Sequence, residues 1–379
     1  MSVTNPTTVI ERTVTKVAIY EGSCNLQELS NIYYIEELEH QYSPSHWSHR
    51  MDKDAVIDAH VKEITEGTNL SRVVARTALN IQYGDSDSEK MDLYLPEGEP
   101  TKLPFLVYIH GGYWQFLSKE ESGFMAAPLV SNGIAVMVMD YDIAPKAVKH
   151  DESRRPDDQI KFWTSSNDQR CHSGILIAAA CQTQRDRYPG HCNVTDRCRS
   201  RWKVAQCEGD MDLIVAQVRR SIASIFHLYP HNAGIYLCGH SAGAHLVAMT
   251  LCTDWTEYKV IPDIKGALLV SGVYDLLPII DTYVNDALKM SQEVALKNSP
   301  MQYGRHMNAG TCQVVIAVAE HDSPEFHRQS QQYFQSLMES GLDVSYVLVD
   351  GTDHFNVIEK LSQEAYGLTQ LILKMILKH

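Results

Sequence analysis

Gly239-His240-Ser241-Ala242-Gly243 is the stretch that decides which fold this sequence predicts. The apolar run 234–238 before it is typical of a buried strand, and residues 244–252 after it are apolar at helical spacing. Glycines are needed on both sides because side chains there would collide with the neighbouring strand and helix. A chance match in a loop is the competing interpretation, but a strand and a helix on the correct sides favour a nucleophilic Ser241 at a sheet edge.

Length and composition restrict the class of protein. The chain has 379 residues, 44% of them hydrophobic, which suits one large α/β domain or two smaller ones. Its net charge of −14 argues against partners such as nucleic acid or an anionic membrane. No signal-peptide pattern and no apolar run of transmembrane length is present, and the nine cysteines include no C-x-x-C pair. We therefore expect a cytoplasmic protein with reduced thiols.

Strand patterns and helix patterns alternate along most of the chain. Strands are expected at 78–83, 90–95, 104–109, 133–139, 234–238, 264–270, 312–318 and 344–349, and helices at 36–42, 52–66, 118–130, 210–225, 244–252, 324–340 and 355–378. This alternation predicts a mostly parallel, doubly wound sheet with helices on both faces. Together with the serine turn it predicts the α/β-hydrolase fold.

A glycine pair follows the strand predicted at 104–109, in His110-Gly-Gly-Tyr-Trp114. Glycine allows a backbone N–H to point at a developing oxyanion with no side chain in the way. In an α/β-hydrolase the loop after the third strand supplies one such donor, and the residue after the nucleophile supplies the other. We therefore expect the oxyanion hole to be formed by Gly111 or Gly112 together with Ala242. A plain Gly-Gly turn is the simpler alternative.

A serine nucleophile needs a base, and this fold orders its residues as Ser, then Asp or Glu, then His. His354 follows the last predicted strand, where the base belongs, whereas His240 and His245 lie in or just after the serine turn and His321 lies beside the candidate acid. We therefore expect His354 to be the base.

The acid should follow one of the preceding strands. Asp322 comes just after the strand predicted at 312–318, Asp275 follows the strand before that and is second choice, and Asp353 is badly placed for Nδ1 of its neighbour. The predicted catalytic residues are therefore Ser241, Asp322 and His354.

The alternation breaks at about residues 147–208, which show no sustained helical or strand period. We interpret this segment as a poorly ordered insertion, or as sequence foreign to the fold, within a single domain at 36–379. Its cysteines and histidines are spaced too irregularly for a zinc site, so no metal is expected. Residues 1–35 form an N-terminal arm, and a loose arm and an edge strand both fit it.

Several longer stretches resemble the animal-type kynurenine formamidases, or arylformamidases, of the α/β-hydrolase superfamily. They are Glu37-Leu-Glu-His-Gln-Tyr-Ser-Pro-Ser-His-Trp47, His110-Gly-Gly-Tyr-Trp114, Asp140-Tyr-Asp-Ile-Ala-Pro-Lys146, Ile235-Tyr-Leu-Cys-Gly-His-Ser-Ala-Gly-Ala-His245, Glu320-His-Asp-Ser-Pro-Glu-Phe326 and Asp353-His-Phe355. The resemblance covers roughly residues 36–379 apart from the insertion. It implies hydrolysis of N-formyl-L-kynurenine to L-kynurenine and formate in tryptophan catabolism, with no metal or other cofactor.

The resemblance leaves three points open. Tyr113, Trp114 and Phe355 flank the predicted catalytic positions, so they are expected either to form an aromatic wall for the substrate's aryl ring or to pack in the core. The competing functions are a carboxylesterase acting on small esters and an inactive binding protein with a hydrolase fold. A homodimer is compatible with the sequence, which does not determine the oligomeric state.

The insertion generates the first prediction. Joining Lys146 to Gly209 should give a protein at least as stable and at least as active as the full chain, because long surface insertions cost little in closure entropy. Urea unfolding and hydrolysis of N-formyl-L-kynurenine measure the two quantities. If the deletion unfolds the chain, or destroys activity without disturbing Ser241, residues 147–208 belong to the fold itself.

Overall fold

The computed structural model describes residues 26–97, 102–145, 210–304 and 312–378. The predicted insertion at about 147–208 lies outside the described residues, as does most of the predicted N-terminal arm. Within the described part, an eight-stranded sheet forms the centre of the fold.

The sheet has the strand order β1-β2-β4-β3-β5-β6-β7-β8. Its strands are β1 (Arg76–Gln82), β2 (Lys90–Leu95), β3 (Phe105–Ile109), β4 (Ala135–Met139), β5 (Ile235–His240), β6 (Ile264–Val270), β7 (Gln313–Ala319) and β8 (Val344–Val349). β2 pairs antiparallel with β1 and with β4, and every other neighbouring pair is parallel. The predicted mostly parallel sheet is confirmed, and its parallel strands direct their carboxyl ends to one edge.

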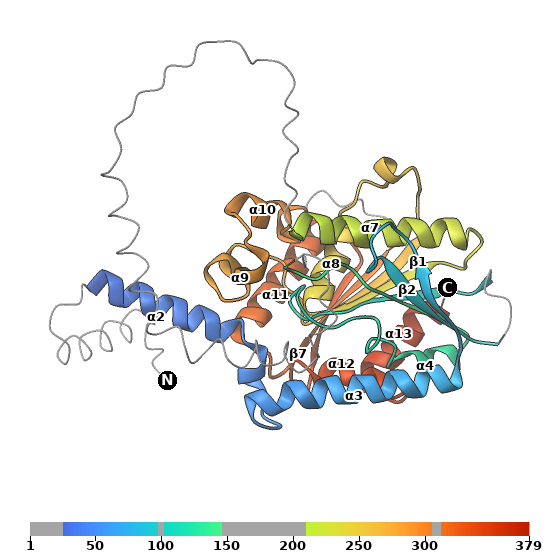
Figure 1. Ribbon diagram of the computed structural model, residues 1–379, viewed down its shortest axis with the longest axis horizontal. Coiled ribbons are helices and arrows are strands. Elements are labelled where there is room, and N and C mark those ends of the chain that lie inside the picture. The colour runs from blue at the N-terminus through green and yellow to red at the C-terminus, as the bar shows by residue number, and fades with distance from the viewer. Residues whose placement is uncertain (1–25, 98–101, 146–209, 305–311, 379) are drawn as a thin grey trace, which may run out of the picture. The chain divides into compact units, whose positions relative to one another are not determined.

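Helices cover both faces of the sheet, as predicted (Figure 1). Along one side lie α3 (Lys53–Val74), α4 (Ala126–Val130), α12 (Asn356–Glu359) and α13 (Gly367–Leu377), and on the other lie α7 (Asp210–Leu228) and α8 (Ala242–Leu251). The remaining α-helices of the described residues are α2 (Leu26–Gln41), α9 (Asn285–Leu288), α10 (Gln292–Lys297) and α11 (Pro324–Glu339), and the 3₁₀ turn η1 (Pro44–Trp47) precedes α3. α2 begins ten residues before the predicted helix at 36–42.

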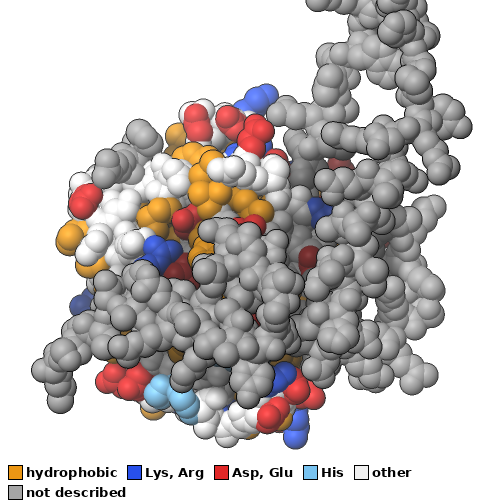
Figure 2. Space-filling view, turned by 90° about the vertical axis from the view of Figure 1, so that its left-hand side faces the viewer, with side chains coloured by type: hydrophobic (Ala, Val, Ile, Leu, Met, Phe, Trp, Pro, Cys, Tyr) orange, Lys and Arg blue, Asp and Glu red, His pale blue; other side chains and the backbone are white. Residues whose placement is uncertain are grey.

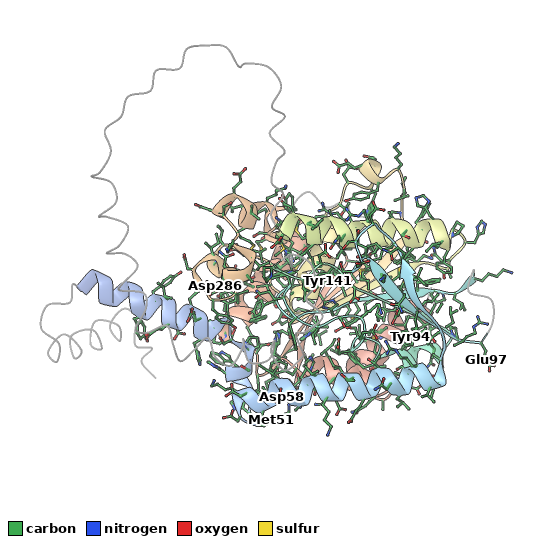
Figure 3. All side chains as sticks on the ribbon, in the orientation of Figure 1. Met51, Asp58, Tyr94, Glu97, Tyr141 and Asp286 are labelled. Carbon is green, nitrogen blue, oxygen red and sulfur yellow. The ribbon has the colours of Figure 1, made fainter. Side chains whose placement is uncertain are left out.

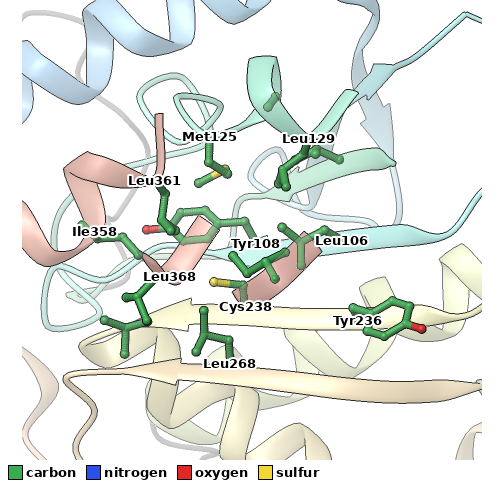
Figure 4. Close-up of a cluster of buried hydrophobic side chains, with 14 of the residues drawn as sticks. Leu106, Tyr108, Met125, Leu129, Tyr236, Cys238, Leu268, Ile358, Leu361 and Leu368 are labelled. Atoms are coloured by element: carbon green, nitrogen blue, oxygen red, sulfur yellow. The ribbon is translucent and has the colours of Figure 1, made fainter. Parts of the chain in front are cut away.

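The central strands are buried on both faces, as parallel strands between two helical layers must be. Figure 4 shows side chains of the cluster on one face, where alternate residues such as Leu106, Tyr108 and Cys238 meet Leu129 of α4 and Leu368 of α13. Each fully buried large apolar side chain contributes about 1.5–3 kcal/mol to folding. This cluster therefore holds the helices to the sheet on that side.

The predicted helix at 118–130 is wrong over its first half, because only Ala126–Val130 is helical. Ser118 donates its Oγ–H and its backbone N–H to the carboxylate of Glu121, at 2.7 and 3.0 Å. The backbone N–H of Lys119 instead donates to Asp140. Such side-chain bonds compete with the helical ladder, so this segment forms turns.

The predicted closing helix at 355–378 is also interrupted. α12 ends at Glu359 and α13 begins at Gly367, with a short 3₁₀ turn and a loop between them. The loop is held by Tyr366, whose hydroxyl donates to the carbonyl of Val357 at 3.0 Å. Glycine at the junction makes a continuous helix less favourable.

The surface of the described part is mixed in charge. On the described part of the face shown in Figure 2, Asp and Glu side chains lie beside Lys and Arg side chains. None of the helices in residues 26–97, 102–145, 210–304 and 312–378 has both the length and the apolar character needed to cross a membrane.

Close backbone packing around the serine turn restricts which residues can stand at positions 239 and 243. A Cβ on Gly239 would lie 2.3 Å from the carbonyl oxygen of Gly243, and a Cβ on Gly243 would lie 2.0 Å from the carbonyl oxygen of Ile109. Both contacts are to backbone, which cannot swing aside. α8 can therefore approach β3 and β5 only with glycine at these positions.

We predict that Gly243→Ala lowers the free energy of unfolding by about 3 kcal/mol, because the added methyl group would force α8 away from β3. Urea unfolding followed by circular dichroism measures the change. Gly367→Ala is the matched control, since a Cβ there has nothing within 4 Å, and it should raise stability by about 0.5 kcal/mol. Equal stability of the Gly243→Ala variant and the unmodified chain would contradict this account.

Candidate active site

The serine turn joins β5 to α8 at the carboxyl edge of the sheet. Ser241 has φ +56° and ψ −119°, a strained backbone conformation for a residue other than glycine. Its backbone N–H donates to the carbonyl of Val270, at the end of β6, at 2.9 Å. Ala242 is the first residue of α8, so its N–H has no acceptor within the helix and is available to an oxyanion.

The glycine loop after β3 packs directly against this turn. A Cβ on Gly111 would lie 2.7 Å from the carbonyl oxygen of His240 and 3.1 Å from Cβ of Ser241. Gly112 has φ +89°, and a Cβ there would lie 2.3 Å from the carbonyl oxygen of Phe116. Gly111 thus brings main chain to Ser241 where a side chain would exclude it, and Gly112 allows the loop to fold closely against Phe116.

Aromatic packing holds the start of this loop. The ring of His110 stacks on Tyr141, labelled in Figure 3, with centroids 4.3 Å apart and an interplanar angle of 12°. The Tyr141 hydroxyl donates to the carbonyl of His110 at 2.9 Å. Burial lowers the pKa of His110 to about 4 and raises that of neighbouring Asp140 to about 7. The loop is therefore supported by a neutral imidazole.

Asp322 and His354 form a buried pair. His354 Nδ1 lies 2.7 Å from Asp322 Oδ1, and the two residues are 3% and 4% exposed. With Asp322 ionised, Nδ1 carries the proton, and Nε2 is left as the proton acceptor that a base requires. The structure brings Asp322 to this position. Asp275, the second choice from the sequence, accepts the backbone N–H of Leu277 with its Oδ1.

The pair lies beside the serine turn because of His240. His240 Nε2 is 2.7 Å from the carbonyl oxygen of His354, and the two rings have centroids 4.7 Å apart. Burial first, and then the neighbouring His354 and His60, hold the pKa of His240 well below its usual range. His240 is therefore a neutral donor that ties the loop of the predicted base to the residue before the predicted nucleophile.

Ser271 is a site residue that the sequence reasoning missed. It follows β6, has φ +48° and is fully buried. Its hydroxyl donates to Asp322 Oδ2 at 2.5 Å, and the same oxygen accepts the N–H of Ala319 at 3.0 Å. These bonds fix the orientation of the carboxylate. The available signal was its position, a polar residue directly after a buried parallel strand.

The other candidate histidines have structural partners. His245 Nε2 is 2.6 Å from the carbonyl oxygen of Asn298, and its Nδ1 accepts the indole N–H of Trp114 at 3.2 Å. Burial lowers the pKa of His245 to about 4. The ring of His321 packs edge-on against His49, with centroids 4.5 Å apart.

The three flanking aromatic residues differ in exposure. Trp114 is fully buried, and Tyr113 is buried with its hydroxyl donating to the carbonyl of Tyr42 at 2.9 Å. Phe355 is partly exposed, and its ring centroid lies 5.6 Å from that of His354. The structure favours core packing for Tyr113 and Trp114, and leaves Phe355 as the aromatic surface beside the pair.

A hollow of about 510 Å³ is lined by Asp322 of the acid loop together with residues that include Trp47, His49 and His321. Ser241 and His354 do not line it, so we do not assign the reaction to it. Among the described residues, no cluster of three or more His, Cys, Asp or Glu side chains is arranged to hold a metal ion.

Comparison with known proteins gives two kinds of similarity. The chain is 46% identical to the kynurenine formamidase of Salmo salar and 45% identical to that of Danio rerio, each over 90% of this chain and 96% of the relative. The family model BD-FAE matches residues 91–153. Esterase B of Lactobacillus rhamnosis superposes with a TM-score of 0.58 at 14% identity, covering 92% of this chain and 94% of the esterase, which is a likeness of fold.

The geometry of the pair generates a prediction about reactivity. Asp322→Asn should slow the reaction of Ser241 with a fluorophosphonate by about 10⁴-fold, because the amide favours the wrong imidazole tautomer. Mass spectrometry of the modified serine peptide measures the rate. Asp275→Asn is the control and should stay within a few-fold of the unmodified protein. The opposite ranking would assign the acid to Asp275.

Proposed function

The chain belongs to the kynurenine formamidase family, and we propose that it hydrolyses N-formyl-L-kynurenine with Ser241, Asp322 and His354 as its catalytic residues. The products are L-kynurenine and formate, in tryptophan catabolism. The observation that carries the assignment of residues is the 2.7 Å contact between His354 Nδ1 and Asp322 Oδ1, next to a strained serine turn.

The first half of the proposed reaction acylates the serine. His354 Nε2 takes the proton of Ser241 as its Oγ attacks the formyl carbon, and Asp322 stabilises the imidazolium that forms. The carbon–nitrogen bond then breaks, and His354 gives the proton to the departing aniline nitrogen. L-Kynurenine leaves, and the formyl group stays on Ser241 as an ester.

The second half returns the enzyme to its starting state. His354 takes a proton from water, which attacks the formyl ester, and formate leaves as Ser241 regains its proton. In both halves the negative charge on the formyl oxygen is held by the N–H of Ala242 and of Gly111 or Gly112. Such donors are preorganised, so they need not reorient during the reaction, and each contributes a factor of about 10²–10³ to the rate.

The aryl ring of the substrate needs an apolar surface near the reacting carbon. We assign this surface to Phe355, because it is partly exposed beside His354, whereas Tyr113 and Trp114 are buried. In this proposal Tyr113 and Trp114 hold the glycine loop in position through their hydrogen bonds to Tyr42 and His245.

The remaining proposals concern organisation and location. We infer one hydrolase domain at 36–379, interrupted at about 147–208, in a cytoplasmic enzyme that works without a cofactor and does not bind nucleic acid or membrane. The net charge of −14 supports the absence of anionic partners. A homodimer is the oligomeric state that we would test first, by light scattering.

Ser241→Ala should reduce turnover of N-formyl-L-kynurenine by about 10⁶-fold without changing the fold, because the three catalytic residues act as a unit. Absorbance of released L-kynurenine measures turnover, with p-nitrophenyl acetate as a second substrate in parallel. Substantial residual activity would exclude Ser241 as the nucleophile. Efficient turnover of the ester alone would instead support the small-ester carboxylesterase, and turnover of neither by the unmodified chain would support an inactive binding protein.

A further inference from the structure

A segment outside the sheet contacts the loops of the proposed active site. We call residues 42–50, which precede α3, the strap. At one end, the carbonyl of Tyr42 accepts the hydroxyl of Tyr113 from the glycine loop at 2.9 Å. The Tyr42 hydroxyl donates to Glu325, on the helix that follows Asp322, at 2.8 Å. The strap is therefore attached both to the glycine loop and to the acid side of the site.

The other end of the strap binds Asp353, the residue before the proposed base. Arg50 contacts both carboxylate oxygens, with Nε 2.7 Å from Oδ2 and Nη2 3.2 Å from Oδ1. Ser48 donates its hydroxyl to Oδ2 at 2.6 Å. Met51, labelled in Figure 3, follows Arg50 directly and lies just before α3. A planar guanidinium held at two points fixes the carboxylate in position and in angle.

Asp353 in turn organises the backbone on both sides of His354. Its Oδ1 accepts the N–H groups of Phe355 and Asn356, at 3.0 and 2.8 Å. Asn356 Oδ1 accepts the N–H of Asp353 at 2.9 Å. The turn that carries His354 is thus closed around one carboxylate, and the strap holds that carboxylate.

Arg50 is shared between two buried acids. Its Nη1 and Nη2 lie 3.2 and 3.3 Å from the carboxylate of Glu359, which is also 2.8 Å from His60 Nδ1. The side chains of Asp353 and Glu359 are 2% and 8% exposed. Burial alone would raise the pKa of Asp353, but hydrogen bonds from Arg50, Asn356 and Ser48 lower it to about 2. Arg50 therefore helps to keep the buried carboxylate of Asp353 ionised while it also binds Glu359.

We propose that Arg50 and Ser48 are positioning residues for the catalytic base, which act through Asp353 to set the orientation of His354. This inference rests on the proposed function, because it takes His354 as the base. Residues at the ends of β5 and β7 bind His354 directly, namely His240 at its carbonyl and Asp322 at Nδ1. The strap acts one residue away, through Asp353, and comes from a part of the chain that belongs to no strand of the sheet.

The charge beside His354 gives this role a distinctive signature. The titratable groups that face His354, directly or through Asp353, are Asp322 from the acid loop, His240 from the serine turn, Asp353 itself, Arg50 from the strap, Glu359 from α12 and His60 from α3. Removing the guanidinium leaves an uncompensated carboxylate next to the base. A nearby negative charge favours the protonated imidazole, so the base becomes active only at higher pH.

The test compares Arg50→Gln and Arg50→Lys with the control Lys62→Gln, which removes an exposed cation from α3 whose partner Glu66 is 3.9 Å away. Each rate is divided by the concentration of serine that reacts with a fluorophosphonate, so that unfolded protein does not lower the measured rate. We expect Arg50→Gln to lower kcat by roughly 10- to 100-fold with KM within about threefold, because a small misplacement of a catalytic group has effects of this size. Arg50→Lys should retain more activity, and Lys62→Gln should match the unmodified enzyme.

The pH profile separates positioning from simple stabilisation. We expect the acidic limb of kcat/KM for Arg50→Gln to move up by about one pH unit, and the second change Asp353→Asn to bring it back. A merely structural strap would lower the melting temperature while leaving both the limb and the rate per reactive serine unchanged, and that result would overturn the proposal. The rates of phosphonylation and of p-nitrophenyl acetate hydrolysis test the strap even if N-formyl-L-kynurenine is not the substrate.

Discussion

Two stretches of backbone, 109–111 and 239–243, meet around Ser241 with no room for a side chain at Gly111 or Gly243, and the arrangement of the site depends on that contact. Gly243 lies against the carbonyl of Ile109 at the end of β3, and Gly111 lies against His240 and Ser241. The contact brings the proposed nucleophile, the glycine loop and the start of α8 to one point of the sheet edge. Backbone atoms keep their positions when side chains change rotamer, so the arrangement is rigid before any substrate binds. Such rigidity is the condition for preorganised oxyanion binding.

The proposed base, His354, is held by a different kind of interaction. Asp322 binds one ring nitrogen of His354, and Ser271 in turn binds the other carboxylate oxygen of Asp322, so the order of the pair is maintained by directional hydrogen bonds. Behind the histidine, Arg50 and Asp353 form an ion pair whose carboxylate is nearly inaccessible to water. A buried charge without its partner is costly, so the ion pair keeps the strap and the histidine loop together.

Burial has opposite consequences for the two classes of titratable group near the site. His110, His240 and His245 are each enclosed, and burial is the largest cause that lowers the pKa of each, so they act as neutral hydrogen-bonding groups. Asp353 is also enclosed, but several donors converge on it, and its pKa falls instead. Neutral histidines around the turn and a compensated ion pair behind the base limit stray charge near the proposed reaction.

The sequence by itself determined where the strands and the serine turn lie along the chain, because these depend on local periodicity. It also determined the predicted roles of Ser241, Asp322 and His354, because these depend on the order of the residues along the chain. Helix boundaries were less accurate, since the bonds of Ser118 to Glu121 break a helix that periodicity favoured. Ser271, the strap and the burial of Trp114 were decided only by the tertiary structure. Arg50 and Asp353 are some three hundred residues apart, and no local pattern encodes a contact that forms only when the chain folds back on itself.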